Sequence, residues 1–82
     1  MNIIIRKSAV RDFKKINEPH KSSIKEKIKT LEDFPSIQNI KQLTNHDPKY
    51  RLRVGNYRIL FDVTETEVIV SRILHRQKSY KK

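Results

Sequence analysis

A β-hairpin is predicted by the sequence Tyr50-Arg51-Leu52-Arg53-Val54-Gly55-Asn56-Tyr57-Arg58-Ile59-Leu60-Phe61. Apolar and polar residues alternate before the turn with the period of two that a strand requires. Gly55-Asn56 is a two-residue turn signal, because glycine supplies the positive φ of the first turn position. Val54 then pairs with Tyr57 and Arg53 with Arg58. Since Arg51 lies two residues before Arg53, three arginines share one face of the predicted hairpin.

The remaining elements follow from local patterns on either side of the hairpin. A β-branched segment at residues 2–6 predicts a short strand. Apolar residues at helical spacing predict a helix with Ser8 as its N-cap and a second helix between Pro19 and Pro35. Residues 36–48 contain turn formers and are predicted to be irregular. A turn at residues 64–67 precedes a last strand at 68–74, whose register stays open.

The order β-α-α-β-β-β predicts one α+β domain over residues 1–82. We expect a twisted, mostly antiparallel sheet with a helical hairpin packed on one face, and a first strand that can pair parallel to a later one. The predicted core consists of Ile4, Phe13, Ile16, Ile24, Ile28, Leu31, Leu52, Val54, Ile59, Phe61, Val63, Val68 and Val70.

Composition excludes several classes of protein. The 82 residues carry 19 Lys and Arg against 9 Asp and Glu, which gives a formal net charge of +10. Such a field attracts polyanions, so nucleic acid, a ribosome, an acidic membrane surface or an acidic protein are the candidate partners. The absence of cysteine excludes disulfides, thiolate zinc sites and a cysteine nucleophile. No apolar run approaches the roughly 20 residues of a membrane helix, so a cytoplasmic protein is expected. Of the candidate partners, we expect nucleic acid, the ribosome and an acidic protein, and no membrane.

The three hairpin arginines, Arg51, Arg53 and Arg58, form the candidate phosphate site. Like charges opposed on a sheet face are destabilising, and a guanidinium presents a planar fork of donors that matches phosphate oxygens. The alternative interpretation is a solvated strand face. Lysines predominate in the helical part of the chain, where we expect a broad docking surface for a polyanion such as ribosomal RNA. The candidate docking residues are Lys21, Lys25 and Lys29.

The basic tail adds His75, Arg76 and Tyr80. The three histidines lack the spacing of a metal site, and there is no glycine-rich phosphate loop, no paired carboxylate and no Ser/His/Asp set. We therefore expect neither metal nor cofactor. Tyr80 can stack on a base, orient a hydroxyl or cover the edge of the core.

The hairpin 50–61, followed by Arg72-Ile73-Leu74-His75-Arg76 and Tyr80, resembles the RelE-type toxins of the RelE/ParE superfamily of bacterial type II toxin-antitoxin systems. The resemblance covers nearly the whole chain. It implies a metal-independent mRNA interferase that enters the ribosomal A site and cleaves mRNA by attack of a ribose 2′-hydroxyl on the adjacent phosphate. It also implies a cognate antitoxin, with the toxin alone a monomer and the toxin with antitoxin a hetero-oligomer.

The resemblance also implies roles for single residues. Arg51 and Arg53 match the basic pair before the turn, and Arg58 matches the arginine after it. Arg76 and Tyr80 match the late arginine and tyrosine. The arginines of the family bind phosphate and stabilise the transition state, while its tyrosine stacks on a base and orients the 2′-hydroxyl.

The general base is left open between two residues. Some RelE toxins carry lysines where Arg51 and Arg53 stand, and a lysine can lose its proton. Arginine cannot, because the ordinary pKa of a guanidinium lies far above the physiological range. Histidine and tyrosine side chains can act as bases, so His75 and Tyr80 are the alternatives.

Two further functions are compatible with the sequence. One is a ParE-like inhibitor of DNA gyrase, which shares the fold but cleaves no RNA. The other is a ribosome- or RNA-binding module without catalysis. The arginine pair before the turn and Tyr80 favour the nuclease, whereas longer helices would favour the gyrase inhibitor.

Overall fold

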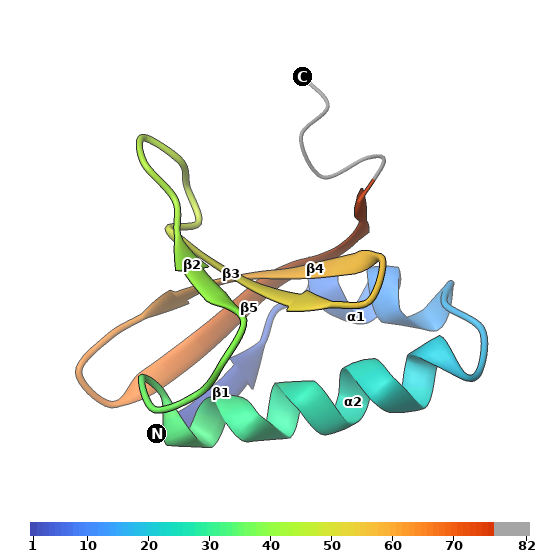
Figure 1. Cartoon of the computed structure of the whole chain (residues 1–82), viewed down its shortest axis with the longest axis horizontal. Helices are drawn as coiled ribbons and strands as arrows, with labels where there is room; N and C mark the ends of the chain where they lie inside the picture. Colours follow the sequence, from blue (N-terminus) through green and yellow to red (C-terminus); the bar gives the residue numbers. More distant parts are fainter. Residues whose placement is uncertain (77–82) are drawn as a thin grey trace.

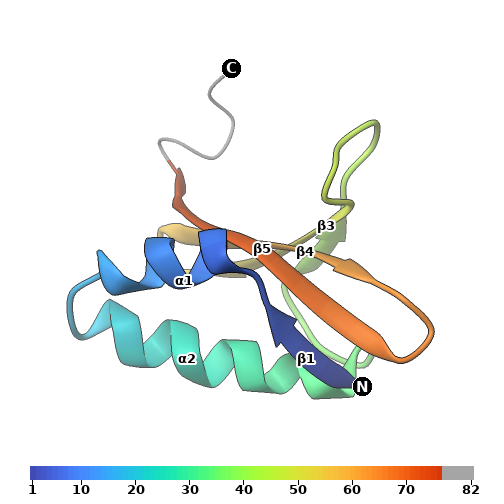
Figure 2. The same cartoon turned by 180° about the vertical axis from the view of Figure 1, so that it is seen from behind.

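A computed structural model describes residues 1–76 of the chain, so Tyr80 lies outside the described residues. The elements are β1 (Asn2–Ile5), α1 (Lys7–Lys14), α2 (His20–Thr30), η1 (Leu31–Asp33), β2 (Ile40–Gln42), β3 (Tyr50–Val54), β4 (Tyr57–Val63) and β5 (Glu67–His75). The five strands form one sheet in the order β1-β5-β4-β3-β2. Strand β1 pairs parallel to β5 and every other pair is antiparallel. Both helices lie on one side of the twisted sheet (Figures 1 and 2), which confirms the expected α+β architecture.

The central hairpin forms with the predicted register. Val54 pairs with Tyr57 and Arg53 with Arg58. Gly55 has φ +57°, and a Cβ built there would meet nothing within 4 Å. Glycine is therefore favoured at this position by the backbone conformation of the turn and not by the space around it.

Strand β2 corrects the prediction that residues 36–48 are irregular. Ile40 pairs with Leu52, Lys41 with Arg51 and Gln42 with Tyr50. A strand of three residues is too short to show a period in the sequence, and it forms because β3 offers an unpaired edge. The sheet therefore has one more strand than the sequence predicts.

The last strand contains an irregularity that settles its register. Leu60 pairs with Arg72, whereas Phe61 pairs with Val70, so Ser71 is the extra residue of a β-bulge. The bulge keeps both Val70 and Ile73 on the buried side of the sheet, where they are 0 % and 4 % exposed.

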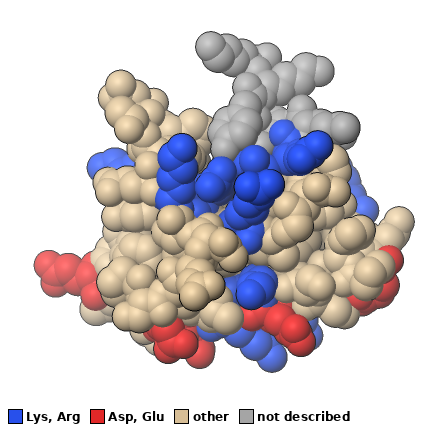
Figure 3. All heavy atoms as spheres, in the orientation of Figure 1, with Lys and Arg blue, Asp and Glu red and all other residues tan. Residues whose placement is uncertain are grey.

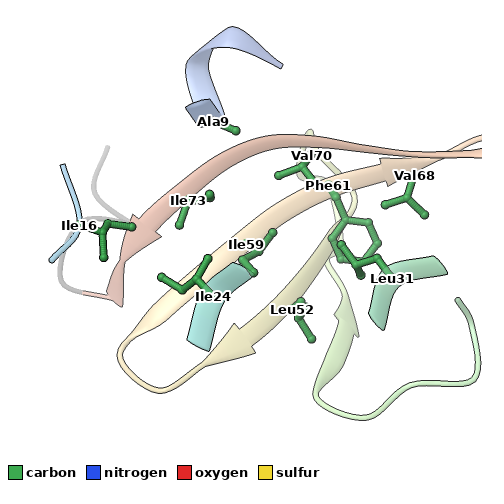
Figure 4. Packing of buried hydrophobic residues seen from close by; sticks show 10 residues of the cluster. All are labelled: Ala9, Ile16, Ile24, Leu31, Leu52, Ile59, Phe61, Val68, Val70 and Ile73. Carbon is green, nitrogen blue, oxygen red and sulfur yellow. The ribbon is translucent and has the colours of Figure 1, made fainter. Parts of the chain in front are cut away.

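The core lies between the sheet and the two helices (Figure 4). Most of the predicted core residues are buried or pack against the core. Ala9 and Ile73 are also buried there, although they are not among the predicted core residues. Ile4 was wrongly predicted to be buried and is 41 % exposed. Because side chains alternate along a strand and Ile3 packs against the core, Ile4 points to the sheet face that no helix covers.

Helix α1 covers the edge of β5 beyond the point where β1 ends. The Ser8 hydroxyl donates a hydrogen bond of 2.6 Å to the Ser71 carbonyl. The Asp12 carboxylate accepts the backbone N–H of Ile73 at 3.0 Å. Ser8 is therefore not the N-cap that the sequence suggested: the helix begins at Lys7, and no side chain caps it. Its hydroxyl instead satisfies a strand carbonyl that has lost its neighbouring strand.

The same aspartate forms an ion pair across this edge. Its two oxygens accept hydrogen bonds from Arg72, at 2.7 Å from Nε and 3.1 Å from Nη2. The hydrogen bond to Asp12 raises the pKa of the Arg72 guanidinium above its ordinary value. Neither of the helices in residues 1–76 is long and apolar enough to cross a membrane.

Candidate nucleic-acid interface

The sheet face away from the helices carries the predicted arginine cluster. Leu52 and Ile59 are buried toward the helices at 1 % and 0 % exposure. Strand alternation then places the intervening arginines on the opposite face, where Arg53 and Arg58 lie directly opposite each other. Lys41, from the strand that the sequence did not predict, pairs with Arg51 and joins them. We call the set Lys41, Arg51, Arg53 and Arg58 the basic face.

The members of the basic face differ in burial. Arg58 lies on a central strand and is only 9 % exposed. Arg51 is half-buried, while Arg53 and Lys41 are exposed. A buried guanidinium has few rotamers available, so the protein fixes its donors before any anion arrives, which is the property that electrostatic catalysis requires. Arg58 is therefore the best-positioned residue of the face for holding a phosphate.

Asp62 brings a negative charge to the same face by alternation along β4, and its Oδ1 accepts the backbone N–H of Lys49 at 2.8 Å. Figure 3 shows Lys and Arg side chains gathered above β3 and β4, with the acidic side chains spread around the lower half of the view. The separation leaves a positive field over the uncovered face of the sheet.

His75 is not brought to the basic face. It pairs with Tyr57, and their rings meet edge to face with centroids 5.2 Å apart. Tyr57 lies on the helix side of the sheet, two residues before the buried Ile59, so His75 lies on that side as well. Its neighbour in sequence, Leu74, is the residue that pairs with Arg58. Adjacency to Arg76 in the sequence therefore does not place the His75 ring among the arginines.

Arg76 lies at the turn end of the basic face. It directly follows β5, and its backbone N–H donates to the carbonyl of Asn56 at 2.6 Å. Asn56 belongs to the turn that joins the strands of Arg53 and Arg58. The structure thus brings the chain of Arg76 to the arginines that the sequence grouped with it. Tyr80 falls outside the described residues.

The lysines of α2 form a separate surface on the helical side of the molecule. The Lys21 ammonium lies 5.2 Å from the centroid of the Phe13 ring. Lys25 and Lys29 are exposed, one helical turn apart. They border an apolar groove between the helices that is lined by Ile5, Val10, Phe13, Ile28 and Ile73. These lysines therefore cannot act on the same phosphate as the basic face.

Within residues 1–76, no three His, Asp or Glu side chains converge in a way that could hold a metal ion. The chemistry available at the basic face is that of fixed positive charge and hydrogen-bond donors. Such a face can bind a phosphate and stabilise additional negative charge on it.

Comparison with known proteins identifies the family. A model of the family described as "ParE toxin of type II toxin-antitoxin system, parDE" matches residues 3–80. Toxin RelE3 of Methanocaldococcus jannaschii is 32 % identical over 84 residues, which cover 98 % of this chain and 96 % of that protein. The chain belongs to the RelE/ParE family of type II toxins.

Solved structures agree with this RelE/ParE assignment. The RelB-RelE antitoxin-toxin complex from Methanococcus jannaschii matches with a TM-score of 0.77 and 31 % identity, over 94 % of each chain. The isolated RelE toxin of E. coli matches with a TM-score of 0.76 over 96 % of this chain and 87 % of that one. At 18 % identity the second match shows the shared fold alone.

Proposed function

We propose that this RelE/ParE-family toxin is a ribosome-dependent mRNA interferase that acts in the cytoplasm. The observation that carries the proposal is Arg58, a buried guanidinium at 9 % exposure, directly opposite Arg53 on a sheet face that no helix covers. Opposed like charges cost folding free energy, so a face that keeps them is best explained by an anionic ligand.

The proposed reaction is a transesterification at one phosphodiester of the message. The ribose 2′-oxygen loses its proton and attacks the adjacent phosphorus, and the bond from phosphorus to the 5′-oxygen breaks. The products are a cyclic phosphate and a 5′-hydroxyl, whose oxygen takes up a proton. Arg58, with Arg51 and Arg53, binds the non-bridging oxygens and stabilises the charge that develops on the pentacovalent phosphate. Arg76 adds a further cation at the turn end of the face.

We assign the removal of the proton from the 2′-hydroxyl to Tyr80. His75 packs against Tyr57 on the helix side of the sheet, which weakens it as the candidate base. A tyrosine can stack on the base and orient the 2′-hydroxyl from one position, as the resemblance to RelE toxins implies.

Two partners belong to the proposal. Lys21, Lys25 and Lys29 would dock the toxin on ribosomal RNA, on a surface separate from the one that cleaves. A cognate antitoxin is proposed because the related toxin from M. jannaschii was solved as a RelB-RelE complex. The apolar groove bordered by Lys25 and Lys29 suits an amphipathic acidic segment of such an antitoxin.

The test uses purified toxin, programmed ribosomes and primer extension on the message. We expect cleavage within the A-site codon, and none of the same message without ribosomes. Tyr80→Phe should reduce the single-turnover rate at saturating ribosomes more than His75→Ala does, and the wild-type rate should continue to climb above pH 8. An equal loss in both variants would remove the assignment of the proton to Tyr80, and an uncut message would contradict the proposed reaction.

A second candidate function has one specific observation in its favour, namely that the matching family model carries the ParE description. In that case the toxin would inhibit DNA gyrase. A supercoiling assay with gyrase, run beside the primer extension, separates the two functions, since an interferase leaves supercoiling unchanged.

A further inference from the structure

Strand β2 adds a lysine to the basic face that the hairpin pattern alone does not reveal. Lys41 pairs with Arg51, and directly paired residues of antiparallel strands project from the same face. Ile40, on the other side of β2, packs against the core together with its partner Leu52. The burial of Ile40 therefore turns Lys41 to the uncovered face, where it is exposed.

The position of Lys41 creates a second pair of opposed like charges on this face of the sheet. Lys41 opposite Arg51 is a like-charge cross-strand pair, and so is Arg53 opposite Arg58. The two pairs are neighbours along β3. A charge on an edge strand can also serve to prevent edge-to-edge association, and β2 is one of the two edge strands of the sheet. A lysine at position 42 would prevent such association equally well, and it would not lie opposite Arg51.

We propose that Lys41 binds the RNA phosphate next to the one held by the arginines, so that the single strand leaves the site across β2. The inference rests on the proposed RNA-cleaving function. A lysine suits this place because its ammonium is a flexible point charge that follows a phosphate of variable position, whereas the bidentate geometry of arginine suits the reacting phosphate. The Cβ atoms of paired residues on one face lie about 5 Å apart, so the long and flexible Lys41 side chain can reach a phosphate adjacent to the one that Arg51 contacts.

The decisive variant exchanges two neighbouring residues of β2. Lys41→Gln combined with Gln42→Lys keeps the net charge at +10 and keeps a lysine on the edge strand, but moves the ammonium to the helix side. Lys41→Gln alone and Gln42→Lys alone complete the set. Each protein is titrated by fluorescence anisotropy against a single-stranded oligonucleotide with 2′-deoxyribose at every position, which cannot be cleaved. The affinity is measured at several salt concentrations, and unfolding temperatures are recorded for all four proteins.

For single strands, each phosphate contact contributes about 0.7 to the slope of log K against log salt. We expect Lys41→Gln to lower that slope by about 0.7, and the exchange variant to lower it by the same amount. Gln42→Lys alone should keep the wild-type slope. Lys41→Gln should unfold at the same temperature as the wild type or a higher one, because it removes a like-charge pair, so its weaker binding does not reflect misfolding.

A wild-type slope in the exchange variant would overturn the inference, because total charge and not the face of Lys41 would then govern binding. No change in Lys41→Gln would overturn it too. The assay requires no cleavage, so a toxin that binds through Lys41 but leaves the message intact contradicts the proposed function and not this contact.

Discussion

Replacing Asp12 with alanine tests how α1 is held on the sheet. The Asp12 side chain is 14 % exposed and has three donors within hydrogen-bond distance: the backbone N–H of Ile73 and two nitrogens of Arg72. This carboxylate satisfies a strand edge that β1 does not reach. Because β5 continues to His75 and is followed by Arg76, the anchor also holds the end of β5, which approaches the basic face.

The expected loss is the sum of two unequal contributions. A part-buried N–H without an acceptor costs about 1–3 kcal/mol. The Arg72 side chain is 46 % exposed, so its ion pair is screened by solvent and contributes only about 0.2–1 kcal/mol. Asp12→Ala should therefore lower the free energy of unfolding by about 2 kcal/mol. Since 1 kcal/mol corresponds to about 4–8 °C for a domain of this size, the unfolding temperature should fall by about 10 °C.

Two companion variants separate the contributions. Asp12→Asn keeps an oxygen that can accept the Ile73 N–H, and should lose about 1 kcal/mol or less. Arg72→Gln removes only the ion pair, and a double-mutant cycle with Asp12→Ala should give a coupling of about 0.2–1 kcal/mol. The measurement is urea unfolding followed by circular dichroism. If Asp12→Asn is as destabilised as Asp12→Ala, the backbone hydrogen bond is not the dominant interaction and the reasoning is refuted.

Four further predictions concern other parts of the molecule. Arg58→Met should lower single-turnover cleavage on saturating ribosomes at least tenfold, because it removes a guanidinium that stabilises the charge developing on the phosphate. Circular dichroism checks that the variant is folded, and equal cleavage would remove Arg58 from the site. Replacing Lys25 and Lys29 together with alanine should weaken ribosome association and its salt dependence but leave saturated cleavage intact, and a slower saturated rate would contradict separate docking and cleaving surfaces. Gly55→Ala should lower the free energy of unfolding by about 1–2 kcal/mol, because an alanine is strained at positive φ, and Gly55→Asn should lower it by less. If calorimetry shows equal losses for the two variants, the positive φ is not the cause. Hydrogen bonds from the Ser22 hydroxyl and, to a lesser extent, from the Ser22 backbone N–H lower the pKa of Glu18 from its ordinary value of 4.5. The Glu18 carboxylate therefore stabilises the fold above pH 4.5, and this contribution disappears as the pH falls through the lowered pKa. Glu18→Gln should flatten the acid side of a plot of stability against pH, and an unchanged plot would exclude the contribution.

Much of the candidate site could be predicted from local pattern. The positive φ of a glycine and the alternation of strand residues act over two to five positions, and together they set the hairpin register that opposes Arg53 and Arg58. The excess of cations over anions is likewise independent of the fold. The arginine cluster of the candidate phosphate site and its charge therefore follow from the sequence, because each depends on neighbours in the chain.

Other features depended on partners that are distant in the sequence. Lys41 joins the basic face only because β2 finds the free edge of β3, and Asp12 meets Arg72 from 60 residues away. His75 illustrates the same limit, since which way its ring points depends on the pairing with Tyr57 and on the bulge upstream in β5. A local period determines how residues alternate, but it does not determine which strand lies alongside or on which side the helices pack. Those choices are made by the burial of apolar surface and the pairing of backbone groups over the whole chain, and they were decided by the tertiary structure.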